Sequence, residues 1–120
     1  MRTDLGRNES PPQQNDVYIL HFESQYWEGA QHYVGYTSKG ILERLQVHRS
    51  GRGSRLVKYA LDHGVDFVVG KLERGYPDKG SARRREIRLK REGHLDRHCE
   101  VCIANKERLA EIGMEVALSE

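Results

Sequence analysis

Apolar residues along this chain gather in three short runs that are typical of buried β-strands. These runs cover Val17–Phe22, His32–Tyr36 and Val65–Leu72. The polar segment Glu23–Gln31 joins the first two runs, and so short a connection predicts an antiparallel hairpin. The spacing therefore predicts one three-stranded sheet that is mainly antiparallel.

Between and after these runs, apolar residues recur with helical spacing. Gly75–Asp78 is expected to be a turn. Thr37 or Ser38 is expected to cap the first helix, and Ser54 the second. We expect Ile41, Leu42 and Leu45 to face the core from the first helix. The predicted helices are Lys39–Arg49, Ser54–His63, Lys79–Glu92 and Ile103–Ile112. Together, strands and helices predict an α/β (α+β) fold, a small sheet flanked by helices.

The predicted helix Lys79–Glu92 carries an acid on its inner face. Ala82, Glu86 and Leu89 fall at the spacing of one helical face, while arginines and lysines cover most of the rest. Ala82 and Leu89 are small or apolar, so Glu86 is expected to point inward. A carboxylate is rarely buried without a partner or a cation.

Length and charge restrict the class of protein. A chain of 120 residues is expected to form one domain, with a polar, disordered leader at 1–16 and a C-terminal helix and tail at 99–120. The net charge of +2 divides into −1, +6 and −3 for residues 1–16, 17–98 and 99–120. A basic centre favours a polyanionic partner. No apolar run approaches the roughly 18 residues of a membrane helix, and the N-terminus lacks a signal-like apolar segment. We therefore expect a cytoplasmic protein with no membrane partner.

Five residues form a candidate catalytic set. Tyr18 and Tyr33 fall on neighbouring strands, and Arg44 and His48 lie four residues apart on one helical face. Hydrolysis of a phosphodiester needs an activated water, neutralised phosphate oxygens and help for the leaving alkoxide. Arg44 can grip phosphate oxygens in bidentate fashion, His48 can accept a proton near neutral pH, and Glu86 can hold a divalent cation. Each residue taken alone is more often structural.

The order of these residues resembles the GIY-YIG nuclease family. Asp16-Val17-Tyr18 stands where that family has its GIY, and Tyr33-Val34-Gly35 where it has YIG. The segment Leu42–Leu45 with His48 resembles the family's arginine-bearing helix, and Glu86 stands at its metal-binding glutamate. The resemblance covers residues 17–91 and is to the small, free-standing members.

This resemblance implies a metal-dependent endonuclease that acts on DNA, with Mg²⁺ or Mn²⁺ on Glu86. It implies structure-specific or weakly sequence-specific cleavage. Tyr18, Tyr33 and His48 all remain candidates for the general base, with Tyr33 slightly favoured. A phenol has an ordinary pKa of about 10, so either tyrosine would need nearby cations to act as a base.

Exposed basic residues are the candidate DNA contacts. Arg55 and Lys58 lie opposite the apolar stripe of the second helix, and Arg84 and Arg88 belong to the arginine-rich third helix. They are either phosphate-backbone contacts or solvated surface charges. An alternative function is therefore a catalytically inactive nucleic-acid-binding module with the same fold.

Two histidines and two cysteines near the C-terminus suggest a zinc site. His94, His98, Cys99 and Cys102 could supply a tetrahedral set of ligands, although His98 and Cys99 are adjacent. Structural sites usually take their ligand pairs from separated segments, so a metal-free cysteine pair in a reducing compartment is the alternative. If zinc binds, it fastens the C-terminal helix to the end of the third helix. An interaction domain held by zinc is a third possible function.

Overall fold

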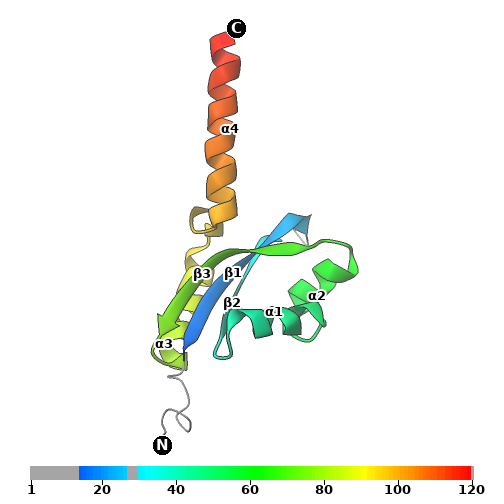
Figure 1. Ribbon diagram of the computed structural model, residues 1–120, viewed down its shortest axis with the longest axis vertical. Helices are drawn as coiled ribbons and strands as arrows, with labels where there is room; N and C mark the ends of the chain where they lie inside the picture. Colours follow the sequence, from blue (N-terminus) through cyan, green and yellow to red (C-terminus); the bar gives the residue numbers. More distant parts are fainter. Residues whose placement is uncertain (1–13, 27–29, 120) are drawn as a thin grey trace, which may run out of the picture.

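A three-stranded antiparallel sheet forms the centre of the protein, with β1 between β2 and β3 (Figure 1). The computed structural model describes residues 14–26 and 30–119. Its strands are β1 (Asn15–Tyr26), β2 (Ala30–Thr37) and β3 (Phe67–Tyr76). The predicted α+β class and the antiparallel three-stranded sheet are confirmed.

Four α-helices and one short 3₁₀ segment accompany the sheet in the described residues. Figure 1 shows α4 projecting away from the sheet as a single long helix. None of the helices described has the length and apolar content that a bilayer crossing requires. The helical elements are α1 (Ile41–Arg49), α2 (Arg55–Asp62), α3 (Lys79–Glu92), η2 (Leu95–Arg97) and α4 (Glu100–Ser119).

The central strand β1 separates two hydrophobic clusters. Tyr18, Leu20 and Phe22 pack with Val57 and Ala60 of α2. The alternate residues of the strand face the other way, where Val17 and Ile19 pack with α3. This accounts for the unbroken apolar run of β1, because a strand covered on both faces has no polar side. Burial of each large apolar side chain contributes roughly 1.5–3 kcal/mol.

The buried face of α3 is the predicted one. Ala82, Glu86 and Leu89 are its buried residues, and the helix has the predicted bounds. Asp78 begins it with a reciprocal capping box, in which the side chains of Asp78 and Ser81 each bond the other's backbone N–H. In α2, Ser54 is the N-cap as predicted, and its hydroxyl accepts a hydrogen bond from the Val57 N–H.

The predicted ends of all three strands were wrong, and β3 starts at Phe67 instead of Val65. The strands of the hairpin are longer than expected, since β1 starts at Asn15 and reaches Tyr26. Residues 15 and 16, which were assigned to the leader, are buried in β1, and residues 1–13 lie outside the described part of the chain. The predicted turn at Gly75 is also wrong, because β3 continues through Tyr76 and is paired with β1 there. Backbone pairing can extend a strand into polar residues. The hydrophobic pattern of the sequence does not reveal such polar strand ends.

Three details of the helices also differ from the prediction. Leu42 does not face the core but is 76% exposed, whereas Ile41 and Leu45 pack against the first cluster. Gly40, with φ of 91°, is the N-cap of α1, while Thr37 accepts a hydrogen bond from the backbone N–H of Lys39. The last helix begins at Glu100 and runs past Gly113 to Ser119. A glycine inside a helix lowers its stability by only about 1 kcal/mol and need not end it.

Candidate functional site

A chain of three polar side chains lies on the sheet face covered by α1 and α2. The hydroxyl of Tyr18 is 2.7 Å from Nε2 of His48, and Nε of Arg44 donates a hydrogen bond to the same hydroxyl at 3.2 Å. Tyr18 and His48 are fully buried. Because Arg44 donates to the phenol oxygen, the phenol proton is directed to Nε2, and the histidine proton is then assigned to Nδ1.

Burial sets the protonation of this chain of side chains. It raises the pKa of Tyr18 to about 12, although the hydrogen bond from Arg44 acts in the opposite direction. Burial, with the nearby charge of Arg44, lowers the pKa of His48 to about 4. At neutral pH the site therefore holds a protonated phenol hydrogen-bonded to a neutral imidazole.

Tyr33 completes the aromatic part of the site. Its ring centroid lies 6.3 Å from that of Tyr18 and 5.4 Å from the ring of His48. Gly35 makes this arrangement possible, since a Cβ there would be 2.5 Å from the Tyr18 hydroxyl and 3.0 Å from the Tyr33 ring. Gly53 does the same for His48, where a Cβ would lie 2.5 Å from Nδ1. Both glycines therefore leave space for the polar cluster.

Glu86 comes to this cluster from α3. Its side chain is 9% exposed, and Oε2 lies 3.3 Å from Nζ of Lys90. The same Lys90 Nζ is 5.9 Å from the centroid of the Tyr33 ring, so it links the acid to the tyrosine. The charge of Glu86 also contributes to the raised pKa of Tyr18. Tyr18, Tyr33, Arg44 and His48 are thus in mutual contact, and Glu86 is connected to them through Lys90.

Arg44 also lines a hollow of about 370 Å³ on the surface. Lys39 and Lys79 contribute to its walls, together with Glu43 and polar residues of β2 and the loop that follows. Both lysines are exposed. A hollow lined by one guanidinium and two ammonium groups is suited to a phosphate group.

The four predicted DNA contacts lie on two separate helices. Arg55 and Lys58 are exposed on α2, and Lys58 forms an ion pair with Asp62 at 2.7 Å. Arg84 and Arg88 are exposed on α3 and line a second hollow of about 390 Å³. Their binding role stays a prediction.

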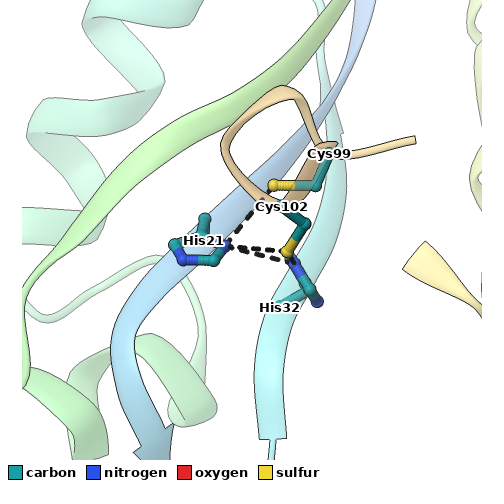
Figure 2. A group of neighbouring side chains, drawn as sticks. All are labelled: His21, His32, Cys99 and Cys102. Carbon is teal, nitrogen blue, oxygen red and sulfur yellow. Dashed lines mark hydrogen bonds between the residues drawn. The ribbon is translucent and has the colours of Figure 1, made fainter. Parts of the chain in front are cut away.

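A separate group of two histidines and two cysteines lies where the hairpin meets the start of α4 (Figure 2). His21 of β1 and His32 of β2 are directly opposed across the hairpin. Cys99 is the residue before α4, and Cys102 lies in the first turn of that helix. The four potential ligand atoms all lie within 4.8 Å of one another. This cluster could hold a metal ion.

Only half of the predicted zinc ligands belong to this cluster. Cys99 and Cys102 are members, but His94 and His98 flank η2 at its two ends and are not. His94 has a left-handed backbone, with φ of 52°, at the connection that follows α3. The other two members, His21 and His32, were not predicted because they lie 67 or more positions before the cysteines in the chain.

Several site residues were missed at the sequence level. The alternation of β1 and β2 assigns His21 and His32 to one face of the hairpin, which was a usable signal once the register was known. Lys39 and Lys79 gave no signal, because nothing in the sequence brings the start of α1 close to the start of α3. Lys90 was one of many basic residues on α3 and could not be singled out.

No protein-family model, curated protein or solved structure matches this chain. Support for a function therefore comes from the side-chain geometry.

Proposed function

We propose that the protein is a metal-dependent endonuclease that hydrolyses DNA phosphodiesters and belongs with the GIY-YIG type. The observation that carries this proposal is the convergence of Tyr18, Tyr33, Arg44, His48 and Glu86 from separate strands and helices around one polar cluster. A small domain gains little stability from so much buried polarity. We infer that the cluster serves chemistry and not stability.

The residues present fit a divalent cation at Glu86. A buried carboxylate offers hard oxygen ligands, and Mg²⁺ or Mn²⁺ is commonly held by one or two carboxylates with waters and substrate phosphate. When bound, the ion would neutralise charge on the phosphate and stabilise the leaving oxygen. Arg83 and Lys90 partly compensate the carboxylate, and a bound cation would share or displace their contacts.

Water activation is assigned to Tyr18 and His48 acting together. With a pKa of about 12, Tyr18 is not a phenolate at neutral pH and cannot be a base by itself. It can take a proton from water while its own proton passes to Nε2 of His48 across 2.7 Å. Because the pKa of His48 is about 4 without substrate, this transfer depends on a negative phosphate bound at Arg44, which favours the charged imidazole. The hydroxide formed attacks phosphorus, the bond to the leaving alkoxide breaks, and the alkoxide takes up a proton from solvent water. The positive charge left on His48 is offset by the negative phosphate held at Arg44.

Arg44 has two roles in this mechanism. Its Nε hydrogen bond fixes the Tyr18 oxygen, which keeps the phenol proton directed at His48. Arg44 also lines the hollow shared with Lys39 and Lys79, and its remaining N–H donors are assigned to phosphate oxygens there. Tyr33, whose ring is tilted against Tyr18 and edge-on to His48, then orients the attacking water.

A supercoiled-plasmid assay tests the proposal. The full-length protein is incubated with plasmid in Mg²⁺, in Mn²⁺ or in chelator, and conversion to nicked and linear forms is followed on gels. We expect metal-dependent nicking that falls by about 10²-fold or more in Glu86→Gln and in Arg44→Ala. Glu92→Gln, an exposed acid at the end of the same helix as Glu86, is the matched control and should cleave normally.

Two results would contradict the assigned function. Full activity in Glu86→Gln or Arg44→Ala would remove those residues from the mechanism. Salt-dependent DNA binding without any nicking in either metal would instead indicate the inactive nucleic-acid-binding module. Circular dichroism of each variant separates these results from loss of the fold.

A further inference from the structure

The four atoms of the His21, His32, Cys99 and Cys102 cluster have the spacing of a tetrahedral zinc site. Bonds of about 2.0–2.1 Å to nitrogen and about 2.3 Å to sulfur give tetrahedral edges of roughly 3.3 Å between nitrogens and roughly 3.5 Å between nitrogen and sulfur. His21 Nδ1 is 3.3 Å from His32 Nε2, 3.4 Å from Cys99 Sγ and 3.5 Å from Cys102 Sγ. His32 Nε2 is 3.2 Å from Cys102 Sγ.

Hydrogen bonding alone does not explain this arrangement. Nδ1 of His21 approaches three atoms at nearly equal distances, yet a ring nitrogen has either one proton or one lone pair in the ring plane. It can therefore make one well-directed hydrogen bond, not three. A lone pair directed at a common centre satisfies all three distances at once. Figure 2 shows the four side chains pointing toward that centre from the hairpin and from the start of α4.

We propose that His21, His32, Cys99 and Cys102 bind one Zn²⁺ ion in a structural site. Four protein ligands fill a tetrahedral coordination shell, so no position is left for a substrate or a reactive water. Two ligands come from directly opposed positions of an antiparallel hairpin, and two come from positions three apart at the start of a helix. These are the separated ligand pairs that a structural zinc site requires.

A glycine in β3 leaves space for the sulfur of Cys99. Gly70 is buried, and a Cβ at this position would lie 2.5 Å from Sγ of Cys99. Cys99 itself is fully buried. A hollow of about 380 Å³, lined by His21 and Cys102 among others, provides an access route for the ion.

The site determines how α4 is attached. This helix contacts η2 and β3 near its start, and its residues 103–113 are all exposed. Zinc would tie its first turn to β1 and β2, and not to the end of α3 as the sequence suggested, because both histidine ligands come from the hairpin. The proposed zinc is independent of the proposed nuclease, because its ligands are none of the five catalytic candidates.

The zinc content of the full-length protein tests the site. We expect one zinc per chain after dialysis, and a cobalt-substituted protein with the intense visible bands of tetrahedral Co²⁺ and the near-ultraviolet bands of two thiolate ligands. Cys102→Ser and His32→Asn should each lose stoichiometric zinc. The matched control is the double variant His94→Asn, His98→Asn, which removes the two nearby histidines outside the cluster and should retain zinc.

Hydrogen exchange measures the attachment of α4 separately from the folding of the sheet. Chelation of the wild-type protein should remove protection from the first turns of α4 while β1 and β3 stay protected. Loss of zinc in the His94, His98 control would overturn the proposal, as would wild-type protein that is folded by circular dichroism yet binds no zinc. An octahedral cobalt spectrum would do the same, and the wild-type spectrum decides the matter even if a variant fails to fold.

Discussion

Tyr18 of β1 and Gly35 of β2 are register partners, and the phenol of Tyr18 lies directly over the glycine. The Tyr18 hydroxyl would be 2.5 Å from a Cβ at residue 35, well inside the contact distance of two heavy atoms. The glycine of the YIG-like tripeptide is thus required by packing: it is the space in which the tyrosine cluster forms.

We therefore predict that Gly35→Ala displaces Tyr18 and Tyr33 and lowers cleavage by about 10²-fold, the cost of an ångström-scale misplacement of catalytic groups. The control is Gly113→Ala on α4, where nothing lies within 4 Å of the added Cβ. Plasmid nicking at equal protein concentration measures both. Unchanged nicking by Gly35→Ala would mean that the position of Tyr18 does not matter for the chemistry.

Tyr18→Phe keeps the ring and removes only the hydroxyl between Arg44 and His48. We predict loss of cleavage with retention of DNA binding, because the proton path from water to His48 is broken. The free energy of unfolding should fall by about 1–3 kcal/mol, since a buried acceptor and donor are left without their partner. Normal cleavage by Tyr18→Phe would transfer the role of base to Tyr33 or a bulk-water mechanism.

The low pKa of His48 predicts how stability depends on pH. Its pKa is about 4 in the folded protein and 6.5 as its ordinary value, so the unfolded chain binds this proton first as the pH falls. Above about pH 6.5 the group has no effect; between pH 6.5 and pH 4 it favours unfolding by an amount that grows to the order of 3 kcal/mol. Urea unfolding at several pH values should show a shallower loss in His48→Gln than in wild type. Equal slopes in the two proteins would contradict the predicted titration.

Lys39 and Lys79 are predicted to bind DNA phosphates at the hollow next to Arg44. Replacing both with alanine should weaken binding and reduce the slope of log affinity against log salt by about 2, because each lysine neutralises one phosphate and so accounts for about one unit. Fluorescence anisotropy across a salt series measures this slope. The matched control replaces Lys106 and Arg108, two exposed cations of α4, and should leave the slope unchanged. A reduced slope in the control alone would move the DNA path to the projecting helix.

The hydrophobic pattern was sufficient to predict the sheet and α3, but not to predict where the strands and helices end. The run around Ile19 and the face formed by Ala82, Glu86 and Leu89 are strong periodic signals, and the structure buries each of them. Leu42 had the same local signal as Leu45 but lies on the outer side of α1. One short helix offers more apolar positions than its contact face can bury, and only the angle at which it packs selects among them.

The catalytic candidates could be predicted from the sequence, whereas the metal cluster could be predicted only in part. Tyr18, Tyr33, Arg44, His48 and Glu86 could be chosen from the sequence because each has a distinctive place in an ordered pattern. The partners of Cys99 and Cys102 could not, because the nearest histidines in sequence are not the nearest in space. A hairpin register and the turn after α3 bring His21 and His32 to the cysteines, and neither is encoded locally.

The sequence by itself determined which residues can be buried, which can carry charge into the core and the order of the strands and helices, because these follow from local periodicity and side-chain chemistry. Tertiary structure alone decided which side chains meet: Tyr18 with Gly35, Lys90 with Glu86, and a pair of histidines with a pair of cysteines. Contacts between residues far apart in the chain depend on the packing and register of whole elements, and no short stretch of sequence contains that information.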